Sequence, residues 1–410
     1  MKNRIIILSL CLFSSLYSFS QSLDDLLKKL VENNSELKAV HSQFLAAQEK
    51  IEQESQLPNA SFGVGIPALR PETRLGAQTT MISASQMFPW FGTFKSKESV
   101  MIEISEIKYQ EIVSLKLDLF YQMKEAYYNL ASNLQKTKVL EENINLYNAL
   151  EQIALSKVES GKATTADVYR VQLKRQKVEQ AIIEIDFQNQ QLTAIINQLS
   201  KEPLENEIIP SEDFSEIEPL NFDTSAFRIT IQNHPKIASL SHQSLASENR
   251  QSLSQKMNAP MIGFGIDYSL VSERTDANPI NNGRDILIPK IMLSIPLYQK
   301  KNNSIQKEEQ LIQESLDFQK IAFEDLIMRQ LINIKTDYDK NLSQILFYEK
   351  QIVTTEQTIE ILITNYSSGA TGFDEILQLY NELLGYQLDI LQAKLQVKLN
   401  ISKVEKLTAY

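Results

Sequence analysis

Side chains that commonly carry catalysis or bind metals are few and scattered in this sequence. The three histidines, His41, His234 and His242, form no His-x-x-x-His pair and belong to no carboxylate cluster at ligand spacing. The only cysteine, Cys11, lies in an apolar segment near the N-terminus. The sequence has no Walker phosphate loop, no Gly-x-Ser-x-Gly nucleophile motif and no Gly-x-Gly-x-x-Gly after a strand. We therefore expect no catalytic residue, no metal site and no cofactor.

Carboxylates follow two short glycine-containing breaks in sequence that otherwise favours helix. The breaks read VESGKATTADVY (158–169) and YSSGATGFDEIL (366–377). A glycine in the left-handed conformation can end one helix, and a carboxylate in the first turn of the next helix is stabilised by the helix dipole. In an oligomer the same carboxylates could instead form a ring that binds or selects cations. Both interpretations apply to Asp167, Asp374 and Glu375.

Heptad spacing surrounds both breaks and predicts long, packed helices. Alternating steps of four and three residues from 327 to 366 meet apolar side chains at most positions, as coiled-coil packing requires. The pattern recurs in the same register from 119 to 158, with Asn133 and Asn341 at matching positions. The chain is therefore an internal duplication, and each half holds a long helix and an antiparallel returning helix. The predicted helices are 95–158 and 164–199 in the first half, and 303–366 and 373–408 in the second.

Upstream of each long helix the hydrophobic period changes to two, which predicts β-strands. The expected strands are 61–70, 79–88, 261–271 and 286–295. Strands of about ten residues suit a tilted membrane strand, and four of them cannot close a barrel, so strands in a membrane would require an oligomer. Aromatic residues gather where strand gives way to helix, as at a membrane interface. These residues are Phe88, Trp90, Phe91 and Tyr298.

The N-terminus has the parts of a secretory signal peptide: the cations Lys2 and Arg4, an apolar run, and small residues before position 21. Cleavage is expected between Ser20 and Gln21, which leaves a mature chain without cysteine. The formal net charge is -10 and no basic tract is present, which argues against nucleic-acid binding. We expect an exported protein with a signal peptide (1–20), a first repeat (21–202), a linker (203–222) and a second repeat (223–410), each repeat beginning with short helices.

The duplicated strand pair and helical hairpin, together with NYSSGATGFDEILQLYNELLGYQLDILQAK (365–394), resemble the TolC-type outer-membrane efflux proteins over essentially the whole mature chain. The stretch SQMFPWFGTFKSK (85–97) is most similar to members that serve heavy-metal or cation efflux. The resemblance implies a mainly α-helical fold with a membrane β-barrel portion. In a homotrimer, the four strands of each chain would be pooled into a twelve-stranded barrel, with an α-helical barrel in the periplasm.

The resemblance also implies a function, a location and partners. The chain would conduct small molecules or metal cations passively, as the outer-membrane channel of a tripartite efflux system. It would lie in the outer membrane of a Gram-negative bacterium, in contact with lipid, and extend into the periplasm. Its partners would be a periplasmic adaptor protein and an inner-membrane pump of the RND type.

By the same resemblance, the two breaks lie at the periplasmic end of the tunnel. The residues implied at the pore entrance are Asp167, Asp374, Glu375 and Tyr366. The residues implied in the helix-tip turns, where the adaptor docks, are Gly161, Gly369, Thr165 and Ser368. Tyr366 either forms a hydrogen bond across the closed entrance or completes the heptad seam. Leu377 stands where the family has a second aspartate, which argues against a double carboxylate ring.

Two other functions remain open at this stage. A protein-secretion duct of type I would have the same fold, and nothing in the tunnel sequence separates small molecules from unfolded polypeptide. A non-conducting periplasmic coiled-coil scaffold would explain the signal peptide and the heptads. It would leave the four amphipathic strands and their aromatic borders without a role.

Overall fold

The computed structural model describes residues 22–211, 214, 219–220, 222–368 and 372–409. The predicted signal peptide, 1–20, lies outside the described residues. The chain divides into two compact units. The helical unit comprises the described residues within Met1–Lys38, Ser114–His234 and Glu324–Tyr410, and the strand-bearing unit comprises Ala39–Val113 and Pro235–Phe323. Each repeat of the sequence contributes to both units, so the repeats are not the compact units of the fold.

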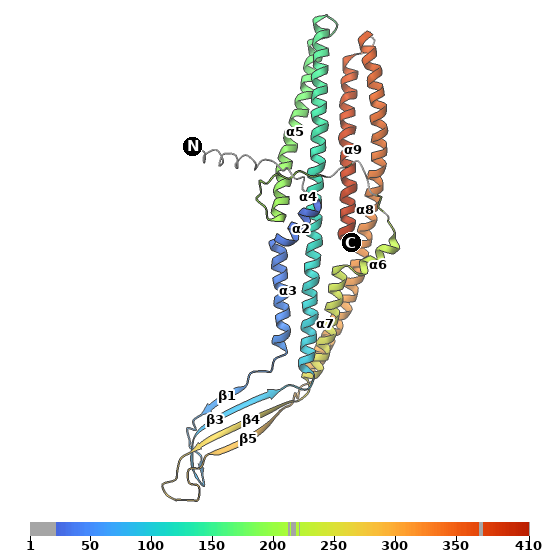
Figure 1. Ribbon diagram of the computed structural model, residues 1–410. Helices are drawn as coiled ribbons and strands as arrows, with labels where there is room; N and C mark the ends of the chain where they lie inside the picture. Colours follow the sequence, from blue (N-terminus) through green and yellow to red (C-terminus); the bar gives the residue numbers. More distant parts are fainter. Residues whose placement is uncertain (1–21, 212–213, 215–218, 221, 369–371, 410) are drawn as a thin grey trace, which may run out of the picture. The chain divides into compact units, whose positions relative to one another are not determined.

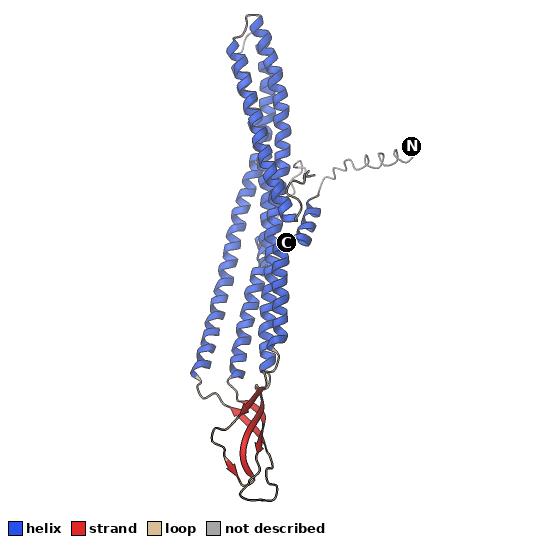
Figure 2. Cartoon of the chain, turned by 90° about the vertical axis from the view of Figure 1, so that its left-hand side faces the viewer, coloured by secondary structure: helices blue, strands red, loops and turns tan. Residues whose placement is uncertain are grey.

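Two long helical hairpins account for most of the helical unit (Figures 1 and 2). Helix α4 (Thr93–Glu159) is followed by α5 (Thr165–Ser200), and α8 (Lys300–Ser368) is followed by α9 (Phe373–Thr408). The 67 residues of α4 and the 69 residues of α8 each extend about 100 Å at the α-helical rise, and both helices contribute to both units. The shorter helices α2 (Leu23–Asn33) and α6 (Thr224–Gln232) also belong to the helical unit.

The heptad seam predicted from the sequence is buried between the helices of each hairpin. Tyr147 of α4 and Val171 of α5 are fully buried in a hydrophobic cluster that also contains residues of α9. In the second hairpin, Tyr338 and Ile345 of α8 pack against Val397 of α9. Helices of this length are stable because each turn buries an apolar side chain against the returning helix.

The polar position in the first seam is satisfied by the returning helix. Asn133 of α4 is buried, and its Nδ2 donates a hydrogen bond of 3.0 Å to Oδ1 of Asn189 in α5. A buried amide without such a partner would lose its hydrogen bonds to water without compensation. The pair therefore favours one register of α4 against α5.

The strand-bearing unit contains α3 (Ser35–Glu54), most of which belongs to it, together with α7 (Pro235–Met257) and an antiparallel sheet (Figure 2). The strands pair in the order β1-β3-β4-β5, all antiparallel, and the short β2 pairs with β3. Their bounds are β1 (Ser61–Gly65), β2 (Glu72–Thr73), β3 (Gly76–Phe88), β4 (Met261–Val271) and β5 (Ile286–Ser294). A mainly helical fold with an antiparallel strand portion, built from a duplicated strand pair and hairpin, is confirmed.

One predicted strand is too long. The sequence pattern suggested a strand over 61–70, whereas β1 ends at Gly65. Pro67 has no backbone N–H to donate to the ladder, and Pro71 lies just beyond, so pairing with β3 stops before them. On the other side, β3 begins at Gly76, three residues before the predicted start.

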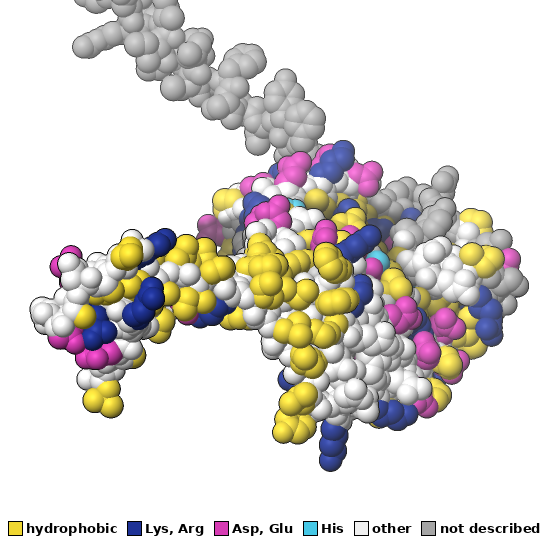
Figure 3. Space-filling model, turned by 90° about the horizontal axis from the view of Figure 1, so that it is seen from below, with side chains coloured by type: hydrophobic (Ala, Val, Ile, Leu, Met, Phe, Trp, Pro, Cys, Tyr) yellow, Lys and Arg dark blue, Asp and Glu magenta, His cyan; other side chains and the backbone are white. Residues whose placement is uncertain are grey.

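The pairing register places apolar side chains together on one face of the sheet. Phe62 and Val64 of β1 pair with Ala84 and Ile82 of β3. The same row continues through β4 into β5, where the pairs are Tyr268–Leu287, Ile266–Pro289, Phe264–Ile291 and Ile262–Leu293. Most of these side chains are exposed, with Phe62 at 80% and Ile291 at 78%. We call this surface the apolar sheet face; broad hydrophobic areas are also exposed in the view from below in Figure 3.

The opposite face of the sheet is more polar than the apolar sheet face, although it also carries methionines of β3 and β5 and Ile288 of β5. Gly263, Gly265 and Ser269 of β4 are buried there, in alternation with the exposed apolar residues. Asp267 on this face forms an ion pair of 2.6 Å with Lys290 of β5. Among the helices that the structure describes, none is both long and apolar enough to cross a membrane.

Candidate functional site

Gly161 ends α4 in the left-handed conformation that the sequence suggested. Its φ is +70°, and its N–H donates to the carbonyl of Val158 at 2.9 Å. The next N–H, of Lys162, donates to the carbonyl of Lys157 at 2.8 Å. These two bonds form a Schellman motif, which satisfies carbonyl groups at the end of the helix. The turn therefore depends on glycine for its backbone geometry.

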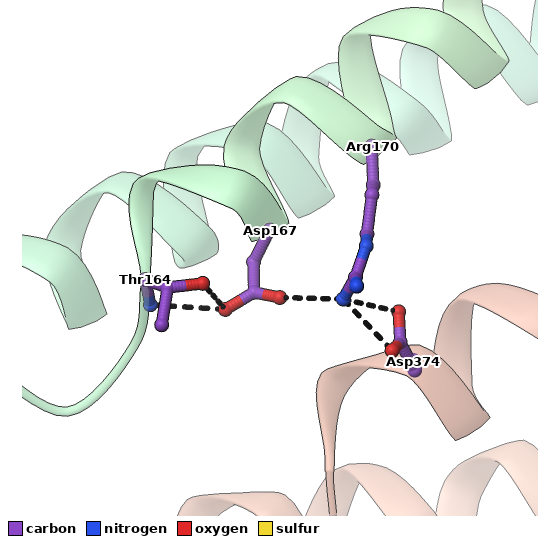
Figure 4. A network of polar contacts seen from close by, with 4 residues as sticks. All are labelled: Thr164, Asp167, Arg170 and Asp374. Atoms are coloured by element: carbon purple, nitrogen blue, oxygen red, sulfur yellow. Dashed lines mark hydrogen bonds and ion pairs between the residues drawn. The ribbon is translucent and has the colours of Figure 1, made fainter.

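Asp167 caps the start of α5. Its Oδ2 accepts hydrogen bonds from the backbone N–H of Thr164 at 3.0 Å and from the Thr164 hydroxyl at 2.9 Å (Figure 4). The carboxylate thus satisfies one N–H just before the helix and lies where the helix dipole favours negative charge. The helix-start interpretation of Asp167 accounts for these contacts.

Arg170 joins the two hairpins at their tips. Its Nη1 lies 3.2 Å from Oδ1 of Asp167 and 2.8 Å from both carboxylate oxygens of Asp374, in the first turn of α9 (Figure 4). Farther along the same two helices, Nζ of Lys174 donates to Oδ1 of Asn381 at 3.2 Å. We call Thr164, Asp167, Arg170 and Asp374 the tip network.

The side chains of the tip network are open to water to different degrees. The Arg170 and Asp374 side chains are 49% and 62% exposed, whereas Asp167 is 14% exposed. An exposed ion pair contributes only about 0–1 kcal/mol, because water and salt screen it. The Arg170–Asp374 pair therefore joins the hairpins weakly enough to be broken by a modest force or by a competing partner.

Apolar packing lies directly behind the tip network. Phe373, Ile376 and Leu377 of α9 are buried in the same hydrophobic cluster as Val168 of α5. Leu377, which replaces the second aspartate expected from the family pattern, is therefore a core residue here. Glu375 is exposed, and the described residues provide no ion-pair partner for it.

Tyr366 packs at the same tip through its ring. Its ring centroid lies 5.6 Å from that of Phe373, and Nζ of Lys157 lies 5.0 Å from the Tyr366 centroid. The hydroxyl is buried and has no hydrogen-bond partner among the described residues. Burial, and secondarily the charge of Asp167, raise the pKa of Tyr366 above its usual value of 10.0. Within this chain, Tyr366 completes the heptad seam.

The remaining tip candidates are only partly described. Thr165 is exposed and is the first residue of α5, and Ser368 is the last residue of α8. Gly369 lies outside the described residues. Gly372, at the N-cap of α9, has a φ of -79° and does not require glycine. The adaptor contacts of Gly161, Gly369, Thr165 and Ser368 remain predictions.

The candidate interface aromatics lie at the ends of the sheet strands. Phe91 and Tyr298 are 86% and 85% exposed. Trp90 and Phe91 contact each other edge to face, with centroids 5.9 Å apart, and Phe88 contacts Phe264 of the apolar sheet face in the same way at 6.0 Å. Large aromatic side chains exposed to this degree are available for contact with a membrane interface.

Sequence reasoning missed Arg170 and Lys157. A signal for Arg170 was present, because an aspartate and an arginine three residues apart lie on the same helix face. Its contact with Asp374, 204 residues away in the sequence, had no such local signal. Among the described residues, no group of three or more histidine, aspartate or glutamate side chains is placed to hold a metal ion.

Comparisons with known proteins identify the fold. No family model matches the sequence, and no curated protein matches it. Among solved structures, the chain is similar to CusC, described in a study of folding and transmembrane channel formation, with 14% identity, a TM-score of 0.77 and coverage of 94% of this chain and 91% of that one. It is also similar to the outer-membrane protein VceC of Vibrio cholerae, with 13% identity, a TM-score of 0.73 and coverage of 94% and 96%.

A third similar structure is the open state of the outer-membrane channel MtrE of Neisseria gonorrhoeae, with 13% identity, a TM-score of 0.75 and coverage of 94% of this chain and 88% of that one. Identities this low establish a common fold and do not transfer individual functions. The matches extend over nearly the whole of each chain. The chain therefore has the TolC-type fold of these outer-membrane channels, as its sequence resemblance predicted.

Proposed function

We propose that this protein is the passive outer-membrane channel of a tripartite efflux system. The apolar sheet face is the observation that carries the proposal. A soluble protein rarely exposes a contiguous apolar surface across four strands, whereas a membrane strand must alternate apolar and polar sides. The exposed Phe62, Phe264 and Ile291 would meet lipid, and the polar face with Asp267 and Lys290 would line the channel.

The free edges of the sheet support an oligomer. Within the sheet, β1 and β5 each have one neighbour, and every pair is antiparallel. In this arrangement β5 of one copy can pair with β1 of the next in the same antiparallel sense. Pairing of this kind removes unpaired backbone groups from lipid, where each would cost several kcal/mol. Three copies would then form the twelve-stranded barrel expected from the fold.

The helical tips would form the periplasmic entrance. The tip network contains an arginine between two carboxylates, so the entrance would alternate in charge instead of presenting carboxylates alone. A periplasmic adaptor that competes for Asp374 or Arg170 would break this ion pair and leave the apolar packing behind it as the remaining contact between the hairpin tips. Because nothing in the sequence resembles a nucleotide-binding motif, energy would come from an inner-membrane pump, which we expect to be of the RND type.

The cargo in this proposal is a small molecule or a metal cation. The cation alternative depends on the short stretch 85–97, and the tip supports it only through the exposed carboxylates Asp374 and Glu375. A non-conducting scaffold is disfavoured, because it has no use for the apolar sheet face.

Single-channel conductance in planar bilayers tests the proposal. The detergent-extracted protein should insert and conduct, and a divalent cation should lower the conductance by binding at the tip carboxylates. Asp374→Ala should reduce this block, whereas Glu356→Ala, at an exposed position of α8 outside the tip network, should not. A well-folded oligomer that never conducts would favour the scaffold instead.

A further inference from the structure

A cavity of about 370 Å³ lies between the last turns of α7 and the first turns of α8, within the strand-bearing unit. One wall is apolar and includes Leu253, Met257 and Ile305. The polar residues include Arg250, Lys301 and Glu309. A small apolar cavity with a few converging charged groups is the usual form of a ligand site.

The charges in this cavity are incompletely paired. Nε of Arg250 lies 3.2 Å from Oε1 of Glu309. Glu309 is only 6% exposed, and its other oxygen, Oε2, is buried without a hydrogen-bond partner in the described part of the chain. A buried carboxylate oxygen without a donor is costly, so a ligand donor would stabilise Oε2 if the Glu309 carboxylate turned toward the cavity. Lys301 is exposed and has no ion-pair partner within the described residues, so it offers a free cation.

The cavity also lies close to the strands in the sequence and in space. Pro296, in its lining, comes two residues after the end of β5, and the exposed aromatic Tyr298 lines it as well. If the apolar sheet face meets lipid, as proposed above, the cavity lies at the level of the phospholipid headgroups on the helix side of the membrane. The following inference therefore rests on the proposed function.

We infer that the cavity binds the headgroup of a zwitterionic phospholipid with a primary ammonium group. The lipid phosphate would pair with Lys301, and the Glu309 carboxylate would turn to accept a hydrogen bond from the ammonium at Oε2. The beginning of an acyl chain would cover the wall formed by Leu253 and Met257. A phosphatidylglycerol headgroup fits less well, because it brings no ammonium for Glu309. A quaternary ammonium matches in charge but has no N–H to donate.

Lipid counting on the intact oligomer tests this inference. The detergent-purified, delipidated protein would be titrated with phosphatidylethanolamine, phosphatidylcholine or phosphatidylglycerol carrying identical acyl chains, and bound lipids would be counted by native mass spectrometry. We expect phosphatidylethanolamine to bind about tenfold more tightly than either of the others, as one charge-assisted hydrogen bond would give.

Two pairs of neighbouring residues supply matched variants. Lys301→Gln should weaken the binding of phosphatidylethanolamine about tenfold, whereas Lys300→Gln, outside the cavity, should leave it unchanged. Glu309→Gln should remove the preference over phosphatidylcholine, and Glu308→Gln should keep it. If Glu309→Gln does not assemble, the inference is still tested by the comparison of the three lipids on the wild type and by the variants Lys300→Gln and Lys301→Gln.

Equal binding of the three lipids would overturn the inference, as would equal effects of Lys300→Gln and Lys301→Gln. Absence of any retained lipid would show that water or a neighbouring copy fills the cavity, and would overturn it too. Conductance measured on the same preparation separates the two proposals. A conducting channel without lipid selectivity contradicts only the lipid site, whereas a protein that neither inserts nor conducts contradicts the proposed function.

Discussion

Arg170 is the side chain that connects the two halves of the tip network. Its replacement by glutamine should leave each hairpin folded and separate Asp167 from Asp374. Since an exposed ion pair is worth up to about 1 kcal/mol, we expect the open state to gain about two- to fivefold per chain. Single-channel recordings should show this as a larger open fraction.

Three further variants give this prediction its controls. Asp374→Asn should have the same effect as Arg170→Gln, and the double variant should add nothing, because both changes remove one interaction. Lys177→Gln, an exposed charge change on the same helix outside the tip network, should behave as the wild type. Additive effects of Arg170→Gln and Asp374→Asn would contradict a direct coupling between the two residues.

Tyr366 gives a pH prediction at the same scale. Its pKa is raised above 10.0 in the folded protein by burial and by Asp167. The stability that this shift contributes is therefore fully present below about pH 10 and is lost as the pH rises through the raised pKa of the folded state. Tyr366→Phe should keep wild-type thermal stability at pH 7 or exceed it slightly, since it removes an unpartnered hydroxyl.

Thermal melts of Tyr366→Phe and wild type at pH 7 to 11 would test this. The variant should lose less stability than the wild type above pH 10, and closure at neutral pH should be unchanged. A leaking Tyr366→Phe channel at pH 7 would show instead that the hydroxyl bonds to a neighbouring copy across the entrance.

At the scale of elements, the turn between α4 and α5 depends on Gly161. An added Cβ would meet no atom within 4 Å, so the cost of Gly161→Ala comes only from the positive φ. We expect a loss of about 1 kcal/mol, and a smaller one for Gly161→Asn, which tolerates this conformation better. Hydrogen exchange in the last turn of α4 would report the loss.

Gly372→Ala is the matched control for Gly161→Ala. Gly372 is equally free of neighbours but has a negative φ, so alanine causes no backbone strain there. Gly372→Ser should stabilise the start of α9 by a few tenths of a kcal/mol as a better N-cap. Equal losses of stability for Gly161→Ala and Gly372→Ala would contradict the claim that the Schellman turn requires glycine at position 161.

The two faces of the sheet should respond oppositely to charge. Phe264→Arg places a cation on the apolar sheet face and should reduce membrane assembly, at a cost of about 2–4 kcal/mol near the middle of a bilayer. Ser85→Arg, on the opposite face of the neighbouring strand β3, should assemble normally and change conductance instead. Membrane fractionation and heat-modifiable mobility on gels would measure both. Normal assembly of Phe264→Arg would contradict the prediction that the apolar sheet face contacts lipid.

At the scale of the whole molecule, the prediction concerns how copies join. Ser61 at the start of β1 and Ser294 at the end of β5 lie on opposite edges of the sheet, three strand spacings apart, so more than roughly 14 Å separates them. Cysteines at both positions are therefore too far apart to bond within one chain. Since the predicted mature chain has no other cysteine, oxidation should produce dimers and a closed three-chain species.

Single Ser61→Cys and Ser294→Cys variants serve as controls for that experiment. Each alone should give at most a dimer, because one cysteine per chain cannot link a ring. A double variant that stays monomeric under oxidation, while still folded and inserted, would contradict pairing of β1 with β5 between copies.

The sequence by itself determined the elements and their duplication. The 3.5-residue period predicted the seams that bury Tyr147 and Tyr338, and the two-residue period predicted the alternation in β4. These features can be predicted from the sequence alone, because the local backbone repeat determines which residues share a face of a helix or a strand. The left-handed conformation of Gly161 could also be predicted locally, because glycine without a Cβ is the residue that adopts a positive φ most easily.

Tertiary structure alone decided how these elements meet. The contact of Arg170 with Asp374, the burial of Leu377 and the unpartnered oxygen of Glu309 depend on the rotation and offset of helices far apart in the sequence. The end of β1 at Gly65 depends on its partner β3. A period shows which side of an element is apolar, but only packing selects the neighbour, because many rotations bury a similar apolar area while few also pair the charges.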